Sequence, residues 1–205
     1  MSPKVTESHK EERKRSILEA AKKIFIKKGY EAFVMQDVID AVDLSRGGVY
    51  SYFSSKEDLF LSILEDSNRT YSKEIKDIAK HPSIWNSLVN DFEDYKSADD
   101  TEDLFGAVQI EYFLINRLLP EKKIYMKERY EFAIEHLMNL FDEGVKKGEF
   151  NPKYPLDTIA RYFITFNDGI NIATIFLNKK DLNFNAQIDI FLSHLASMLG
   201  VNQQK

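Results

Sequence analysis

Apolar residues recur at helical spacing along almost the whole chain, and no segment shows the sustained apolar–polar alternation that is typical of a half-buried strand. In the first periodic segment, Ile17, Ala21 and Phe25 fall on one face of a helix. The pattern predicts an all-α fold of about nine helices, three short ones followed by a larger helical bundle. The expected helices cover residues 12–28, 35–42, 45–52, 55–80, 83–95, 101–118, 121–147, 156–178 and 184–199.

The net charge of −5 hides an uneven distribution along the chain. Residues 1–56 hold 11 lysine and arginine residues against 8 acidic ones, whereas residues 57–205 hold 17 against 25. Such an asymmetry is typical of a basic contact module on an acidic body. Ordinary scatter of surface charge explains a difference of this size equally well, so the charge alone leaves the question open.

Several classes of function lack their characteristic residues in this sequence. There is no cysteine, which removes disulfides, thiolate metal sites and cysteine nucleophiles and fits a reducing cytoplasm. The polar N-terminal segment contains no apolar signal core, and no run approaches the roughly 20 apolar residues that span a bilayer. The four histidines are far apart, and there is neither a glycine-rich phosphate loop nor a GxSxG motif. We therefore expect a cytoplasmic protein that is not an enzyme, has no membrane partner and needs no metal or cofactor.

Residues 44–60, LSRGGVYSYFSSKEDLF, contain the most unusual of the predicted helices. Gly47 and Gly48 stand together inside it, although each glycine costs a helix roughly 0.5–1 kcal/mol relative to alanine. With the helix at 35–42 and the short turn before it, this segment has the spacing of a helix-turn-helix, whose second helix enters the major groove of DNA. Helical pairs with short turns are common, so the spacing is weak evidence by itself.

The residues themselves resemble a known family. The run ILEAAKKIFIKKGYEAFVMQDVIDAVDLSRGGVYSYFSSKEDLFLSIL is similar to the N-terminal domain of the TetR (tetracycline-repressor-like) bacterial transcription regulators, and the resemblance covers about residues 13–64. It implies a DNA-binding domain over residues 1–55, with the helix-turn-helix at about 33–53. It also implies a helical domain for ligand binding and dimerisation over residues 56–205.

This resemblance implies DNA contacts for a set of residues in and beside the second helix of the motif. Arg46 is the expected reader of a base edge, and the two glycines would let the backbone approach the groove. The tyrosines and Lys56 are expected at the phosphate backbone, and Gln36 at a phosphate or a base. The alternatives are a helix cap alone for Ser45 and a solvated surface side chain for Arg46. For the two glycines they are local flexibility or a tight helix–helix crossing, and for the tyrosines buried rings. The set is Gln36, Ser45, Arg46, Gly47, Gly48, Tyr50, Ser51, Tyr52 and Lys56.

Two positions depart from the family pattern. The threonine or serine that usually caps the first helix of the motif is replaced by Phe33-Val34, and a lost cap costs about 1 kcal/mol. Asp37 is expected to offset part of this loss through the helix dipole. The turn residue, commonly glycine, is Asp43, which we expect in the left-handed conformation.

The last two helices are expected to carry a dimer interface. A two-fold DNA site needs two recognition helices about 34 Å apart, and the family pairs its subunits through these helices. The alternative is that their apolar stripe belongs to the core of a single chain. The expected interface residues are Gly169, Ile170, Ala173, Ile188, Phe191, Leu192, Leu195 and Leu199.

Aromatic and amide side chains are frequent in the central helices, where the resemblance implies a cavity for an apolar or aromatic small-molecule effector. A well-packed core with polar outer faces is the alternative. The expected pocket residues are Phe92, Tyr95, Phe105, Gln109, Tyr112, Phe113, Asn116, Tyr130, Phe163, Phe166 and Asn167.

These features together predict a dimeric regulator, in this family usually a repressor, that binds a palindromic operator in double-stranded DNA. The effector would release it by favouring a conformation with lower DNA affinity. The alternative function is that of a helical ligand-binding or interaction protein of the same fold, without ligand-controlled DNA release.

Overall fold

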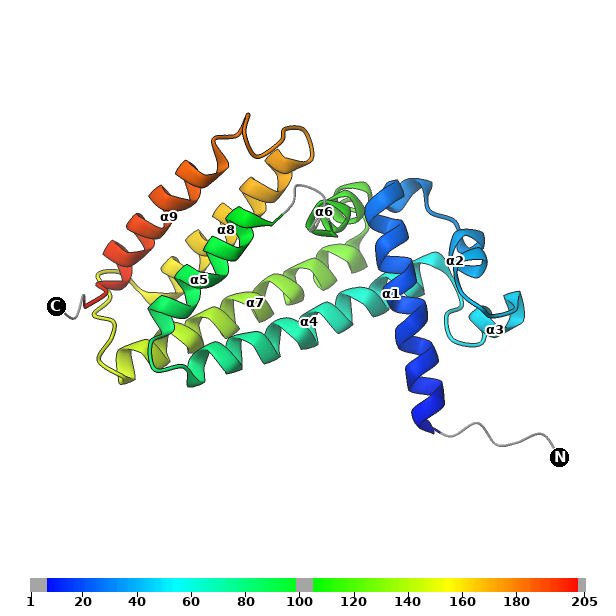
Figure 1. The fold of residues 1–205 in the computed structure, drawn as a ribbon, viewed down its shortest axis with the longest axis horizontal. Helices are drawn as coiled ribbons and strands as arrows, with labels where there is room; N and C mark the ends of the chain where they lie inside the picture. The colour runs from blue at the N-terminus through cyan, green and yellow to red at the C-terminus, as the bar shows by residue number, and fades with distance from the viewer. Residues whose placement is uncertain (1–6, 99–104, 203–205) are drawn as a thin grey trace. The chain divides into compact units, whose positions relative to one another are not determined.

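A computed structural model describes residues 7–98 and 105–202, and within these ranges the chain consists of helices joined by turns (Figure 1). The predicted all-α class is confirmed, because the described residues form nine α-helices and otherwise only one isolated antiparallel bridge, Phe150 to Val201. None of the described helices is long and apolar enough to cross a membrane. The helices are α1 (Glu7–Ala32), α2 (Met35–Ala41), α3 (Arg46–Tyr50), α4 (Lys56–Lys80), α5 (Ile84–Ser97), α6 (Phe105–Ile115), α7 (Pro120–Lys146), α8 (Leu156–Thr174) and α9 (Phe184–Leu199).

Glycine marks two of the helix ends that the sequence predicts. Gly29 has φ 78° and ψ 170°, which breaks the helical path one turn before α1 ends. Gly148, with φ 72°, follows α7 in the same manner. The main difference is at the start of α1, which begins at Glu7, five residues earlier than expected. Residues 101–104 of the sixth expected helix lie outside the described residues.

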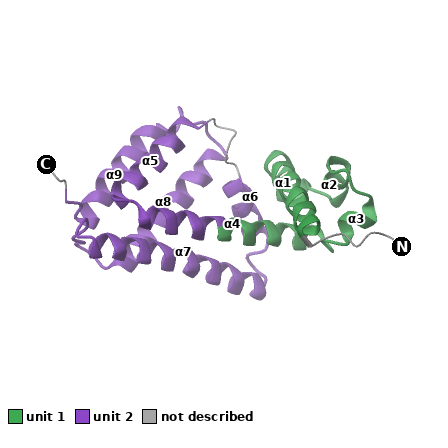
Figure 2. Cartoon of the chain, turned by 60° about the horizontal axis from the view of Figure 1, so that its bottom comes forward, with its two compact units in different colours: residues 1–69 green, residues 70–205 purple. Residues whose placement is uncertain are grey.

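Two compact units make up the chain, residues 1–69 and residues 70–205 (Figure 2). Their boundary falls inside α4, whereas the domain boundary expected from the family resemblance lies before this helix, between residues 55 and 56. The same helix therefore contributes its first half to one unit and its last turns to the other.

An aromatic cluster holds the first unit together. Phe25 stacks on Phe33 with ring centroids 3.9 Å apart, and Phe60 meets Phe25 edge-on at 5.0 Å. Tyr30 lies edge-on to Phe60 at 4.9 Å. All four rings are buried. The cluster therefore joins the end of α1, the short link between α1 and α2, and the first turns of α4.

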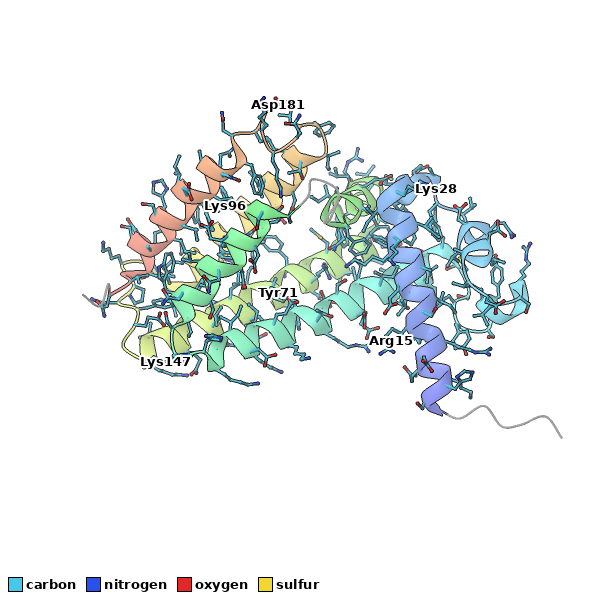
Figure 3. The ribbon with its side chains drawn as sticks, viewed as in Figure 1. Arg15, Lys28, Tyr71, Lys96, Lys147 and Asp181 are labelled. Atoms are coloured by element: carbon cyan, nitrogen blue, oxygen red, sulfur yellow. The ribbon has the colours of Figure 1, made fainter. Side chains whose placement is uncertain are left out.

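The second unit is a helical bundle in which α5, α7, α8 and α9 share one apolar core. At its centre Phe166 stacks on Phe191 with ring centroids 4.0 Å apart, and Phe163 packs on the same ring at 5.5 Å. At the surface, Lys96 on α5 pairs with Asp189 on α9 (Figure 3 labels Lys96). The inner face of α9 is thus occupied by neighbours from its own chain.

Backbone hydrogen bonds hold the end of α9 against the loop that precedes α8. We call this contact, between residues 149–153 and 198–202, the terminal clasp. The amide of Asn151 donates to the carbonyl of Gly200 at 3.1 Å, and two further bonds of 2.9 and 3.0 Å flank it. Gly200 has φ 59°, and a Cβ there would lie 2.0 Å from the carbonyl oxygen of Asn151. Only glycine permits so close an approach.

Candidate nucleic-acid interface

The turn between α2 and α3 closes in a different way from the one that the sequence predicts. Val42 ends α2 in extended backbone, and its carbonyl accepts a hydrogen bond from the amide of Leu44 at 2.8 Å, which closes a three-residue turn around Asp43. Asp43 does not have a positive φ, so the predicted left-handed conformation is wrong. A turn of this kind reverses the chain at negative φ, and for that reason it does not need the usual glycine.

A carboxylate, instead of a hydroxyl, holds the first turn of α2. Val34 occupies the N-cap position in extended backbone and has no side-chain acceptor. The carboxylate of Asp37 accepts from the ammonium of Lys28 at 2.5 Å and from the amide of Val34 at 3.0 Å (Figure 3 labels Lys28). These two bonds, Lys28 first, hold the pKa of Asp37 below its ordinary value. Asp37 thus compensates for the missing cap by direct hydrogen bonds, in addition to the expected interaction with the helix dipole.

The short helix α3 has one buried face and one exposed face. The predicted cap is confirmed, because the hydroxyl of Ser45 accepts from the amide of Gly48 at 3.1 Å. Val49 and Phe53 are 0% and 1% exposed, as their predicted inward positions require. Tyr50 is exposed on the other side of the helix. The core therefore holds α3 through Val49 and, three residues beyond the helix end, Phe53, whereas the outer face of the helix is open to solvent.

The two glycines of α3 have different surroundings. A Cβ at Gly47 would meet no atom within 4 Å, so the backbone there is bare on the outer face. A Cβ at Gly48 would lie 3.3 Å from the hydroxyl of Ser45, so this glycine keeps the cap tight. Ser51 closes the other end of the helix by donating to the carbonyl of Gly48 at 2.6 Å. Of the two glycines, Gly47 is the one that leaves room for another molecule to approach.

Two long side chains of the motif contact a neighbour one helical turn away. The guanidinium of Arg46 lies 5.5 Å from the centre of the Tyr50 ring. The side-chain amide of Gln36 donates to the carboxylate of Asp40 at 2.7 Å. A DNA contact by Gln36 would use its second N–H or its Oε1 atom, or replace that bond.

Lys56 joins the start of α4 to the end of α1. Its ammonium donates to the carbonyls of Tyr30 and Glu31 at 3.0 and 3.2 Å and lies 4.6 Å from the centre of the Tyr30 ring. Burial raises the pKa of Tyr30 to about 12, so this ring stays uncharged at neutral pH. The phosphate contact of Lys56 stays a prediction, and it would use the third N–H of the ammonium. Tyr52, the other tyrosine expected at the phosphate backbone, is half-buried.

The residues expected at a dimer interface lie partly inside the second unit. The stripe on α9 is buried within the chain itself, and none of its members is more than 8% exposed. At these positions the alternative, the core of a single chain, describes the structure, since atoms that are already buried offer no surface to a partner. Ile170 is also buried and Ala173 half-buried, whereas Gly169 is exposed and a Cβ there would meet no atom within 4 Å. The buried members on α9 are Ile188, Phe191, Leu192, Leu195 and Leu199.

The residues expected around an effector separate into three groups. A groove of about 400 Å³ on the surface of the second unit is lined by Phe113 and Tyr130 among others. The polar groups of a second set are bonded to atoms of the same chain, and these residues are Tyr95, Gln109, Asn116 and Asn167. The rings packed in the core, where the core alternative describes them, are Phe92, Phe105, Tyr112, Phe163 and Phe166. The effector pocket stays a prediction.

Two contacts by which α1 stabilises the motif were not predicted from the sequence: those of Lys28 with Asp37 and of Tyr30 with Lys56. Lys28 and Asp37 are nine residues apart and on different helices, so no helical spacing connects them. Tyr30 lies within the run that resembles the family, but its contact with Lys56 joins residues that are 26 positions apart. Both contacts depend on the packing of α1 against its neighbours.

Comparison with known families identifies both parts of the chain. Residues 17–63 match the model described as bacterial regulatory proteins of the tetR family. Residues 88–185 match the model of the tetracyclin repressor-like C-terminal domain.

Individual proteins are similar over most of the length. An HTH-type transcriptional regulator of Bacillus subtilis, YfiR, is 34% identical over 205 residues, which is 100% of both chains. The HTH-type transcriptional repressor AcnR of Corynebacterium diphtheriae is 23% identical over 82% of this chain and 83% of its own. Among solved structures, GusR of Salmonella enterica superposes with a TM-score of 0.71 at 20% identity, covering 96% of this chain and 99% of its own. At these identities, the similarities to AcnR and GusR support the fold alone.

Proposed function

This chain is a member of the TetR family of bacterial transcription regulators, and from that premise we propose that it is a repressor which binds a palindromic operator as a homodimer and is released by a small organic ligand. Regulation of transcription by DNA binding is the activity of the family, which is not a family of enzymes. The proposal adds the form of the operator, the dimer, the direction of control and the ligand. Because its operator would be chromosomal, we place the protein in the cytoplasm.

The exposed face of α3 carries this proposal. Arg46, Gly47 and Tyr50 lie on that face, while Val49 and Phe53 are buried on the opposite one. A helix whose outer face bears a guanidinium, bare backbone and a phenol suits the major groove of DNA, which is about 12 Å wide. Arg46 would donate to a guanine edge, and Tyr50 would contact a phosphate or a thymine methyl group.

An outward stripe on α8 supports the homodimer. Tyr162, Thr165, Gly169, Ile172 and, just beyond the helix end, Phe176 are all exposed and follow one another at intervals of three and four residues. Phe176 is 78% exposed, and an apolar side chain so open to water at the end of an apolar stripe is typical of an interaction surface. The bare backbone at Gly169 would let a second copy approach closely.

Genome-wide mapping of bound sites, followed by fluorescence anisotropy on the recovered fragments, tests the proposal. We expect inverted repeats with half-site centres one helical turn of DNA apart, or a multiple of it. Affinity should fall steeply as salt rises, because phosphate contacts release counterions. A protein that selects no DNA site, or that binds one as a monomer, would contradict it.

The alternative of a regulator without ligand-controlled release has a distinct outcome. It predicts operator affinity that no small molecule changes, including the substrates and products of enzymes encoded beside the bound sites. A compound that lowers operator affinity and also binds the protein alone would decide for ligand control, since a ligand shifts the equilibrium only by its differential affinity.

A further inference from the structure

A groove between α6, α7 and α8 collects positive charge on an otherwise acidic unit. Residues 70–205 hold 16 lysine and arginine residues against 21 acidic ones. Five of the 16 line this groove of about 400 Å³, together with one carboxylate. A volume of this size is in the range of small-molecule sites. The charged lining residues are Arg117, Lys122, Lys123, Lys127, Arg161 and Glu131.

The acidic partners around the groove neutralise only part of this charge. Lys127 lies 3.6 Å from Glu131, in an exposed pair of the kind that contributes little. Asp157 accepts from Nε of Arg161 at 3.0 and 3.1 Å, a contact that does not use the Nη atoms. The guanidinium of Arg117 donates to a backbone carbonyl of its own turn. Around Lys123, Lys127 and Arg161, three cations therefore face the two carboxylates of Glu131 and Asp157, which leaves an excess of one positive charge.

Apolar side chains form the rest of the lining. Phe113, from α6, stacks on Tyr125 of α7 with ring centroids 6.2 Å apart, which orients its ring. Met126 and Tyr130 continue the apolar surface along α7. Lys122 and Lys123 stand in the first turn of α7, where the helix dipole adds positive potential. The groove thus offers an apolar surface beside a cationic rim.

We propose that this groove binds a small organic anion with an apolar body, such as an aromatic or long-chain carboxylate. The anionic group would lie among Lys123, Lys127 and the Nη fork of Arg161, which matches a carboxylate in a bidentate contact. The apolar body would pack on Phe113 and Met126. That this anion is also the effector rests on the proposed function; its binding to the groove does not.

Two fluorescent probes that differ in one charge test the binding. 1-Anilinonaphthalene-8-sulfonate carries the anion, and N-phenyl-1-naphthylamine has the same rings without it. Titrated into the purified full-length protein, the sulfonate should bind at least tenfold more tightly than the neutral amine. The double variant Lys123→Gln, Lys127→Gln should lose at least that factor for the sulfonate and keep the affinity for the amine. Arg161→Lys, which keeps the charge and loses the fork, should weaken the sulfonate by a smaller factor.

Lys146→Gln is the matched control, since Lys146 is an exposed lysine on the same helix outside the groove. Equal affinity for both probes, or equal losses in the control and the double variant, would overturn the proposal. Operator anisotropy with saturating sulfonate reports separately on the effector role. An unchanged operator affinity would refute that role and leave the groove established, whereas absence of any operator binding would refute the proposed function.

Discussion

Loss of the Arg46 side chain should reduce recognition of the operator sequence more than the nonspecific attraction to DNA. Replacing Arg46 by alanine should lower affinity for the operator by roughly 10- to 100-fold, about 1–3 kcal/mol, and relax preference at one base pair of each half-site. Its exposed position implies an unchanged melting temperature. Anisotropy on single-base operator variants, with thermal melting in parallel, measures both.

Arg69→Ala is the control for this change. Arg69 is an exposed arginine of the same unit that pairs with Glu65 on α4, outside the motif. It should leave base preference unchanged. If Arg69→Ala relaxed the preference as much as Arg46→Ala, Arg46 would not be the reader.

Gly47 should show opposite effects on stability and on DNA binding. A methyl group there meets no atom of the chain, so Gly47→Ala should stabilise α3 by roughly 0.5–1 kcal/mol in urea unfolding. The same methyl group would keep the backbone away from the groove and weaken operator binding. Gly106→Ala is the comparison, since a Cβ in α6 would make ordinary contacts with Asn171 at 3.4 Å. A Gly47→Ala variant with undiminished operator affinity would show that the helix does not approach DNA at this point.

The contacts that a residue makes within its own helix could be predicted from the sequence. Contacts between residues far apart along the chain could not. The cap at Ser45 and the inward Val49 and Phe53 follow from spacing within one helix. The carbonyl contacts of Lys56 and the ion pair of Lys28 do not, because they require knowledge of which helices pack together.

The first turn of α2 provides a test at the level of one helix. Val34 is 54% exposed and already has the extended backbone of a capping residue. Val34→Thr should therefore add a hydroxyl cap without moving the chain and raise the unfolding free energy by about 1 kcal/mol. It should also tighten operator binding if the added hydroxyl reaches a phosphate of the DNA. Val34→Ala is the control: it adds no acceptor and should raise neither the unfolding free energy nor the operator affinity. If Val34→Ala and Val34→Thr stabilised the protein equally, the gain would come from the loss of valine.

The ion pair that supports α2 should make stability depend on pH. The folded-state pKa of Asp37 lies below its ordinary value, so the bond from Lys28 and the bond from Val34 contribute stability above the ordinary carboxyl range. That contribution is lost as pH falls through this range and through the lowered pKa. Asp37→Asn should therefore destabilise the protein at pH 7 and much less near pH 3.

Urea unfolding at both pH values measures this difference. Lys28→Met should remove most of the same pH dependence, and the double variant should add little to either single change. A loss for Asp37→Asn that is equal at pH 7 and pH 3 would contradict the assignment.

Helix positions were predictable because each helix has its own apolar face and its own breaks. The turn at Asp43 was not, since the family's glycine suggests a left-handed residue and the chain instead closes a three-residue turn at negative φ. The early start of α1 at Glu7 was also missed. Its first residues, ESHKEERKRS, are all polar and therefore carry no apolar periodicity.

At the scale of the whole molecule, the proposed homodimer would form through the outward stripe on α8. Ile172→Glu places a carboxylate in the middle of the proposed interface, and an unpaired buried charge costs several kcal/mol. Sedimentation at micromolar concentration should show wild type as a dimer and this variant as a monomer. Tyr154→Glu, an exposed aromatic before α8, should remain dimeric. A monomeric wild type would refute the homodimer.

The sequence could not choose between the two apolar faces of the last helices. Both Leu195, which is buried, and Ile190, which is 58% exposed, lie on α9 and read alike as apolar residues of one helix. Which face belongs to the chain's own core is settled by α5, α7 and α8, whose packing no single helix encodes. The interface residues predicted on α9 therefore lie on the face that the chain's own core covers.

The terminal clasp has a consequence for how the molecule opens. Residues 149–153 form a loop with proline and a glycine beside it, a composition that normally exchanges its amide hydrogens within seconds. Here the amides of Asn151 and Lys153 donate to the carbonyls of Gly200, the residue that caps α9, and of Met198 in its last turn, about fifty positions further along the chain. Their exchange with deuterium should therefore wait until the end of α9 detaches. In a hydrogen-exchange experiment these two loop amides would report the fraying of the C-terminus, although no residue of the helix itself is being observed.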